Sequence, residues 1–184
     1  MDLENKNSLI ICVCGKARSG KSLVAEYIRD YFVAKGKKVI ISPYTKYLKK
    51  YINEVTGWDM NDLEKPRDLL QNLSSELIKK RLQRPNFFID RQIEDIDFYS
   101  YFFDVIIIPD VRFEREINCL KERYERVCSV GVIRENYDNG LSLEQKNDLT
   151  EISLDGYRAY DCLIYNNTKE KLYDDTINFL KSIN

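Results

Sequence analysis

The sequence predicts an α/β fold, a three-layer α/β/α arrangement in which helices cover both faces of a sheet of about five parallel strands. A short apolar run at residues 9–14 leads directly into a glycine-rich loop and then into a helical pattern. Further short apolar runs at 39–42, 105–108, 127–133 and 162–165 alternate with helical patterns. The run at 105–108 is apolar at every position, as expected of a strand buried on both faces of a parallel sheet.

The first loop has the complete pattern G-x-x-x-x-G-K-[ST], which is the signature of a phosphate-binding P-loop. Its place between a predicted strand and a helical pattern is the context that such a loop requires. Backbone N–H groups and the helix dipole would then face nucleotide phosphates, Lys21 would reach the β- and γ-phosphates, and the Ser22 hydroxyl would bind Mg²⁺. The predicted nucleotide-binding residues of the loop are Gly15, Lys16, Ala17, Arg18, Ser19, Gly20, Lys21 and Ser22.

The elements that follow can be placed by their apolar spacing. The helix after the P-loop ends near Gly36, and a second helix is expected from Thr45 to about Val55. Pro66 suits the first turn of a helix that runs to about Leu82. The apolar face of that helix is predicted to consist of Leu70, Leu73, Leu77 and Ile78. Helical patterns also cover residues 87–99, 113–123 and 169–183.

The composition is that of a globular chain of 184 residues with a formal net charge of −1. This balance supplies no basic surface for nucleic acid or for an anionic membrane. Five cysteines occur without a C-x-x-C spacing and the chain has no histidine, which argues against a zinc site. The N-terminus is polar, and no apolar run reaches membrane-spanning length. We therefore expect one soluble, cytoplasmic domain over residues 1–184 with a small-molecule partner; a homodimer stays open.

Several polar residues come directly after predicted strands. Ligands of parallel sheets bind at the carboxyl ends of the strands, where Asp110, Arg112, Arg134 and Asn166 fall. Asp110 resembles a Walker B acid that would hold Mg²⁺, although an Asp at such a turn also suits the N-cap of the helix from Phe113. Arg112 lies close enough in sequence to help bind phosphate.

An acceptor site is predicted on the helix after Pro66. Arg67, Gln71 and Ser74 recur at helical spacing on the side opposite the leucines. Arg and Gln one turn apart can hold a monophosphate and a base edge together, whereas a solvated polar face is the plainer reading. Tyr44, after the second strand, is a further candidate for this site; its alternative role is to pack on the core.

Two segments carry a resemblance to a known family. Residues 65–73 read Lys-Pro-Arg-Asp-Leu-Leu-Gln-Asn-Leu and lead to Ser75 and Glu76, which resembles the R-x-L-L-Q-x-L-G-T-E segment of phage and bacterial deoxynucleoside monophosphate kinases. Residues 109–116 read Pro-Asp-Val-Arg-Phe-Glu-Arg-Glu and are similar to the D-V-R-F-x-N-E segment of that family. With the P-loop and the Asn-Asn-Thr at 166–168, the resemblance spans most of the chain.

The resemblance implies a P-loop nucleoside monophosphate kinase fold with ATP and Mg²⁺ as cofactors. It implies a helical acceptor-binding insertion at about 44–100 and a lid at about 134–158. On the donor side it implies ATP phosphate and metal binding by Gly15, Gly20, Lys21 and Ser22. Asn166 would then lie near the adenine.

On the acceptor side, the resemblance makes Arg67 and Gln71 the ligands of the acceptor nucleotide. Asp110 and Arg112 become the metal and phosphate pair. Three positions depart from the family pattern. Arg115 replaces an Asn, and Ser74-Ser75 replaces Gly-Thr. In the lid, residues 148–151 read Asp-Leu-Thr-Glu where the family has H-x-S-E.

The chemistry expected of such a site is phosphoryl transfer from ATP to a nucleoside monophosphate. A phosphate oxygen is already ionised at neutral pH, so this reaction needs no general base and agrees with a chain that lacks histidine. Cationic groups would neutralise the transferring charge. The predicted catalytic residues are Lys21, Arg18, Asp110, Arg112 and Arg134, with Mg²⁺ on Ser22 and Asp110.

Two other functions stay open at this point. One is a P-loop kinase for another small acceptor, such as a dephospho-coenzyme or a sugar acid, whose hydroxyl would want a carboxylate base that Asp110 could supply. The other is a nucleotide-dependent switch or binding protein, which would need elements that sense the γ-phosphate. Stimulation of ATP turnover by a monophosphate would indicate a nucleoside monophosphate kinase. Stimulation by a protein partner would instead indicate a switch or binding protein.

Overall fold

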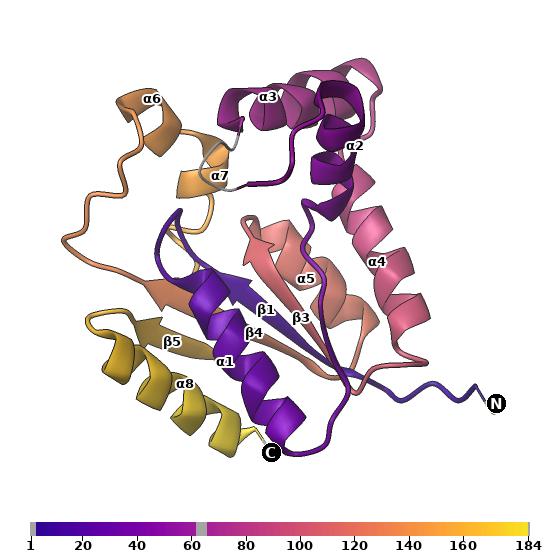
Figure 1. Ribbon diagram of the computed structural model, residues 1–184, viewed down its shortest axis with the longest axis vertical. Coiled ribbons are helices and arrows are strands. Elements are labelled where there is room, and N and C mark those ends of the chain that lie inside the picture. Colours follow the sequence, from indigo (N-terminus) through magenta and orange to yellow (C-terminus); the bar gives the residue numbers. More distant parts are fainter. Residues whose placement is uncertain (1–2, 62–65, 184) are drawn as a thin grey trace.

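In the computed structural model, which describes residues 3–61 and 66–183, five parallel strands form one sheet in the order β2-β3-β1-β4-β5 (Figure 1). The strands are β1 (Leu9–Cys14), β2 (Val39–Ile41), β3 (Val105–Val111), β4 (Val127–Ile133) and β5 (Cys162–Tyr165). The P-loop follows the central strand, so it lies at the middle of the carboxyl edge of the sheet. The predicted fold class is confirmed.

Two pairs of helices complete the three layers. Helices α1 (Lys21–Ala34) and α8 (Lys169–Ser182) lie side by side on one face, while α4 (Phe87–Tyr99) and α5 (Glu114–Arg123) cover the other (Figure 1). Side chains of β1 alternate between these layers because successive residues of a strand point to opposite faces. Ile11 and Val13 belong to the α1/α8 core, whereas Cys12 and Cys14 pack in the α4/α5 core as small apolar residues.

A separate helical region stands above the carboxyl edge of the sheet. It comprises α2 (Lys46–Thr56), α3 (Arg67–Asn72) and the π-helix η2 (Leu73–Arg81). Leu48, Ile52, Leu70 and Ile78 form its small core. The sequence predicted one helix from Pro66 to about Leu82, whereas the structure divides this stretch into α3 and η2. Leu77 is 39% exposed and, like Leu73 and Ile78 of the predicted apolar face, lines an apolar cavity. In a π-helix the backbone bonds span five residues instead of four.

Strand β3 is longer than the run at 105–108 predicted. It continues to Val111, and its pairing with β1 shifts register: Cys12 pairs with Ile108, whereas Cys14 pairs with Val111. One extra residue therefore lies in β3, next to Pro109, which has no N–H for a ladder bond. Asp110 sits in this bulged part of the strand rather than after it, and the bulge sets the direction of its side chain.

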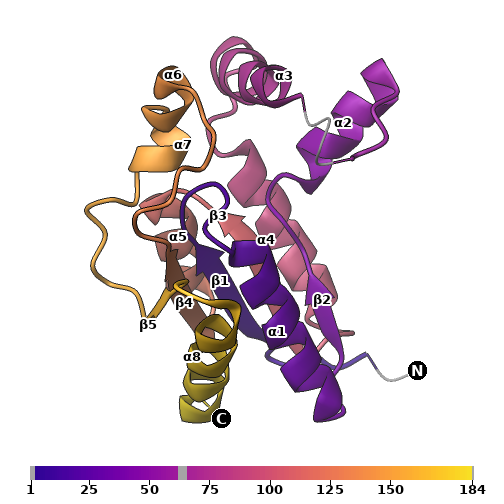
Figure 2. The same cartoon turned by 60° about the vertical axis from the view of Figure 1, so that its left-hand side comes forward.

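The segment 134–158, predicted as a lid and called the lid segment below, contains two short helices that the sequence analysis did not predict. They are α6 (Leu143–Lys146) and α7 (Leu149–Ile152). Ser142 and Asp148 cap them by accepting hydrogen bonds from Gln145 N and Thr150 N. Figures 1 and 2 place both helices at the same end of the molecule as α2 and α3. Among the described residues, none of the helices has the length and apolar character needed to cross a bilayer.

Candidate active site

The P-loop is shaped by two glycines with positive φ. Gly15 has φ +143° and Gly20 has φ +107°, both in the region that side chains rarely adopt. A Cβ on Gly15 would lie 2.4 Å from the Val132 carbonyl oxygen, and a Cβ on Gly20 would lie 2.5 Å from Asn166 Nδ2. Neighbouring backbone and side chains therefore close on the loop at both points, and only glycine fits either position.

Lys21 lies across this loop with its amino group folded back. Its Nζ donates to the Lys16 carbonyl oxygen at 2.5 Å, and the residue is only 8% exposed. Burial lowers the pKa of Lys21 to about 7, and the charge of Arg112 lowers it further, against the opposing charges of Glu151 and Asp110. A negative phosphate group beside this amine would favour its charged form and raise that pKa again.

Asn166 braces the loop from the opposite side. Its Nδ2 donates to the Ser19 carbonyl oxygen at 2.8 Å. The side chain predicted to lie near an adenine is thus attached to the P-loop itself. Ser19 is 3% exposed, and its hydroxyl has no hydrogen-bond partner within the described part of the chain. A buried hydroxyl without a partner is costly, and this one lines the cavity over the P-loop.

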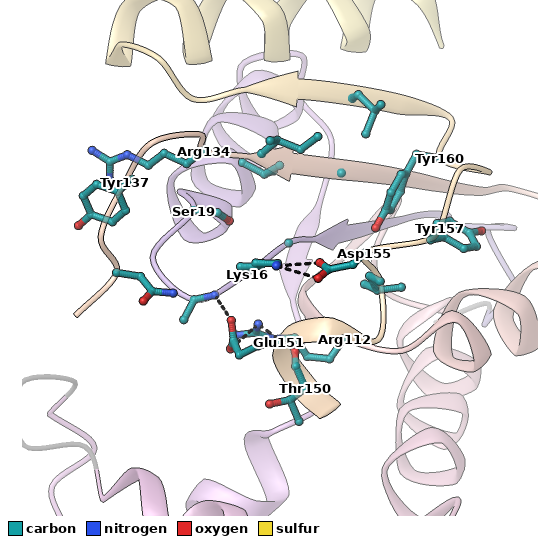
Figure 3. A pocket seen from close by; sticks show the side chains of 18 of the residues that line it. Lys16, Ser19, Arg112, Arg134, Tyr137, Thr150, Glu151, Asp155, Tyr157 and Tyr160 are labelled. Carbon is teal, nitrogen blue, oxygen red and sulfur yellow. Dashed lines mark hydrogen bonds and ion pairs between the residues drawn. The ribbon is translucent and has the colours of Figure 1, made fainter. Parts of the chain in front are cut away.

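A carboxylate from the lid segment reaches the P-loop, which sequence reasoning missed. Glu151 Oε2 accepts from the Ala17 backbone N–H at 2.7 Å, and its Oε1 accepts from Arg112 Nη1 at 2.8 Å (Figure 3). The side chain of Glu151 is 9% exposed and that of Arg112 is 23% exposed. Nearby, Lys16 Nζ pairs with Asp155 at 2.8 Å across the same gap. The Asp-Leu-Thr-Glu of the lid was the only sequence signal for this contact.

Two cavities meet at the Arg112–Glu151 pair. The first, which we name the donor-side cavity after the nucleotide site expected from the P-loop motif, has a volume of about 350 Å³. The P-loop residues Gly15 to Ala17 and Ser19 form one wall, and β4 and the lid segment form the others. The acceptor-side cavity, of about 220 Å³, opens between α2, α3 and the lid segment. Arg112, Thr150 and Glu151 line both cavities. The pair is therefore the partition between them.

The predicted metal residue Asp110 lines the acceptor-side cavity and is tied to the start of α2. Its Oδ1 accepts from Tyr44 N at 2.8 Å, and its Oδ2 accepts from Thr45 N at 3.1 Å and from Thr45 Oγ1 at 2.7 Å. The alternative that Asp110 caps the helix after Phe113 is wrong, because these bonds go to the β2–α2 connection instead.

The structure places Tyr44 in the core rather than in a cavity. It is 4% exposed, and its hydroxyl donates to the Glu116 carbonyl oxygen at 3.2 Å. Of the two readings of Tyr44, the structure supports the packing one.

Two of the three acceptor candidates on α3 and η2 face a cavity. Gln71 and Ser74 line the acceptor-side cavity, together with Ser75 and Lys49. Gln71 Nε2 donates to Asp148 of the lid segment, so the two walls of this cavity touch. Gln71 and Ser74 of the polar stripe thus face a cavity. The Arg67 side chain lies outside what the structure describes.

Of the remaining predicted residues, Arg134 lines the donor-side cavity, whereas Arg18 and Ser22 do not. Arg18, with φ +57°, directs its guanidinium to the Asn139 carbonyl oxygen of the lid segment at 2.9 Å. The Arg134 guanidinium stacks on the Tyr137 ring, 3.6 Å from its centroid, and lines this cavity (Figure 3). Ser22 is exposed in the first turn of α1. Arg134 thus lines one cavity and Arg112 lines both.

Glu116 is a second buried carboxyl group that the sequence did not single out. Its Oε2 accepts from Arg112 N at 2.8 Å and from Phe113 N at 3.1 Å, so it anchors the turn that carries Arg112. Burial raises its pKa to about 7 against these hydrogen bonds, and the charge of Asp110 raises it as well. A Glu three residues after the residue that begins a helix was the available signal.

Comparisons with known proteins agree with the fold. Neither a family model nor a curated protein matches the sequence. Among solved structures, TT1252 from Thermus thermophilus aligns with a TM-score of 0.58 and 13% identity over 95% of this chain and 97% of that one. The APS kinase CysC from Mycobacterium tuberculosis, solved in complex with AMPPNP and APS, aligns with a TM-score of 0.57 and 11% identity over 95% and 98%. The chain therefore has the α/β fold that a P-loop kinase also adopts.

Proposed function

We propose that this protein transfers a phosphoryl group from ATP to a nucleoside or deoxynucleoside monophosphate. The observation that carries the proposal is the junction of the two cavities at Arg112 and Glu151, with the P-loop forming a wall of one of them. A phosphotransferase needs a donor site and an acceptor site that meet where the phosphoryl group passes. A cation at that point neutralises the charge that spreads over the group.

The donor side suits a nucleotide triphosphate. Ala17 presents its backbone N–H to an anionic oxygen, and the buried Ser19 hydroxyl has no partner among the described residues. Lys21 lies folded over the same loop and supplies an amine that a phosphate would hold in the charged form. The likeness to an APS kinase solved with AMPPNP supports the same class of donor.

The acceptor side suits a small polar molecule that carries a phosphate. Lys49 and Arg112 supply positive charge in this cavity, and Gln71, Ser74 and Ser75 supply hydrogen-bonding groups. Amide and hydroxyl groups can read the edge of a base, while cationic groups bind a monophosphate. A monophosphate oxygen attacks without the help of a base. This fits a cavity in which Asp110 already accepts three hydrogen bonds.

The side chains that would hold Mg²⁺ have the right chemistry, because Mg²⁺ prefers hydroxyl, carboxylate and phosphate oxygens and keeps several waters. A carboxylate offers about four lone-pair sites, so Asp110 retains one beyond its three hydrogen bonds. Ser22 and Asp110 would hold the ion. When bound, it would neutralise phosphate charge.

A second candidate is a kinase whose acceptor is a hydroxyl group of another small molecule. The observation that favours it is Glu151, a carboxylate at the junction, where a general base would have to lie. The likeness to an APS kinase bound to APS points the same way. Against it, both Glu151 oxygens accept from Ala17 N and Arg112, which are the donors that a phosphoryl group would itself use.

The test is coupled ADP release from Mg·ATP with each ribo- and deoxynucleoside monophosphate in turn, beside a panel of small hydroxyl acceptors that carry no terminal monophosphate. We expect one or a few monophosphates to stimulate turnover at least a hundredfold, and Lys21→Ala to abolish the stimulation. Stimulation by a hydroxyl acceptor alone would favour the second candidate. ATP binding without stimulation by any acceptor would overturn both.

A further inference from the structure

We propose that Glu151 is an internal competitor for the phosphoryl position: its carboxylate latches the lid segment to the P-loop, and a nucleotide phosphate displaces it. The proposal rests on the proposed function only in requiring that the P-loop binds a nucleotide. It assigns a role to a lid residue beyond substrate contact, and it makes lid opening part of nucleotide binding.

The first argument is chemical. An anion bound at a P-loop needs a backbone N–H from the loop and a cation beside it. Glu151 has both, with one oxygen 2.7 Å from Ala17 N and the other 2.8 Å from Arg112 Nη1. A phosphate oxygen on Ala17 N would occupy the volume of that carboxylate, so the two anions exclude each other.

The second argument is electrostatic. Glu151 is 9% exposed at its side chain, so its charge acts in a poorly solvated place where like charges repel strongly. A triphosphate entering the donor-side cavity would meet this carboxylate directly. Leaving the site is therefore favourable for Glu151 once phosphate arrives, and Arg112 then exchanges a carboxylate partner for a phosphate one.

The third argument concerns the lid segment. Further contacts also attach this segment to the rest of the site: Arg18 to Asn139, Lys16 to Asp155, Gln71 to Asp148, Gln145 to Asp68, and Arg112 to the Thr150 carbonyl oxygen. Glu151 is the member of this group that touches a P-loop backbone N–H. Its release is thus the step that connects phosphate binding to the position of the segment.

The experiment compares Mg·ATP affinity by calorimetry in wild type, Glu151→Gln and Glu144→Gln. The glutamine keeps the size of the side chain but removes its charge and one of its two acceptor oxygens. One of the two charge-assisted hydrogen bonds is therefore weakened and the other is lost. We expect Glu151→Gln to bind ATP about five- to tenfold more tightly. Glu144→Gln removes an equal charge from the lid segment at an exposed position that lines neither cavity, and it should change the affinity less than twofold.

Hydrogen exchange of the Ala17 amide in the nucleotide-free proteins gives an independent readout. We expect faster exchange in Glu151→Ala than in wild type, and equal protection once ATP is bound. Unchanged or weaker ATP binding in Glu151→Gln, or equal gains in both variants, would overturn the latch. Absence of ATP binding in the wild type would instead overturn the proposed function.

Discussion

Arg112 and Glu151 are held 2.8 Å apart at the partition between the two cavities, and the same carboxylate accepts from the P-loop at Ala17. Arg112, which directly follows β3, and Glu151 of the lid segment thus close the path along which a phosphoryl group would pass. Other carboxylates hold the backbone segments that carry Arg112 and Glu151. Glu116 accepts from the backbone N–H of Arg112, and Asp148 caps the turn that begins α7.

Because its pKa is lowered, we expect Lys21 to take up a proton when nucleotide binds. With a pKa of about 7, the amine is mostly neutral at pH 8, and phosphate binding restores its charge. We expect binding of Mg·ATP at pH 8 to take up close to one proton, and the uptake to fade below pH 7, where Lys21 is already charged. Calorimetry in two buffers of different ionisation enthalpy measures it. Lys21→Arg, whose guanidinium stays charged, should bind without uptake; equal uptake in both proteins would contradict the assignment.

Because the pKa of Glu116 is raised, we expect the stability difference between wild type and a Glu116 variant to depend on pH. Its folded-state pKa of about 7 lies above the ordinary value of 4.5, so the folded protein binds the extra proton between these values. Stability from this group is present below about pH 4.5 and is lost as the pH rises to about 7. Both backbone donors use Oε2, so a glutamine can accept them equally well.

Glu116→Gln should therefore gain stability over wild type as the pH rises from 5 to 8. The gain should be on the order of 1–3 kcal/mol in the free energy of unfolding, measured by urea denaturation. A difference between the two proteins that does not change with pH would contradict this account.

We expect a substitution of Gln71 to weaken binding of the acceptor but not of ATP. Replacing it with Ala removes a hydrogen-bonding group from the acceptor-side cavity and frees Asp148. We expect the KM for the acceptor to rise about fivefold to tenfold, the worth of one hydrogen bond, while the KM for ATP changes less than twofold. Glu76→Ala is the matched control, since Glu76 pairs with Lys80 in solvent on the same stretch of helix. Equal effects of both variants on the acceptor would argue against this site.

We expect a substitution of Asn166 to make the P-loop less ordered. Its Nδ2 bond to the Ser19 carbonyl oxygen is a contact between β5's end and the loop. Asn166→Ala should weaken Mg·ATP binding about tenfold and lower the free energy of unfolding by about 1 kcal/mol. The neighbouring Asn167→Ala, whose side chain is exposed, should do neither. Calorimetry and urea denaturation report the two effects separately.

Most of the fold could be predicted from the sequence because short apolar strands and a P-loop leave few topologies open. The bounds predicted for strands 127–133 and 162–165 agree with β4 and β5, and those of 87–99 agree with α4. Where the prediction failed, backbone geometry departed from the regular period. Part of the helix predicted from Pro66 to about Leu82 is the π-helix η2, and the bulge lengthened β3.

The candidate site was predictable only in part. A motif places a residue near a ligand, but the sequence does not say which side chains from distant segments touch. The lid motif at 148–151 placed this stretch in the site, but it did not specify that Glu151 reaches Ala17, a contact between residues far apart in the chain. Tyr44 likewise follows a strand at the ligand-binding edge, yet the structure directs its ring into the core under Glu116.

The central claim is that a phosphoryl group passes from ATP to a monophosphate across the Arg112–Glu151 junction. The measurement that tests it most directly is ³¹P NMR of a mixture of the protein, Mg·ATP and the stimulating monophosphate. The account predicts a new diphosphate of the acceptor formed in step with ADP, and its loss in Arg112→Ala. Release of inorganic phosphate in step with ADP, with the monophosphate unchanged, would contradict it.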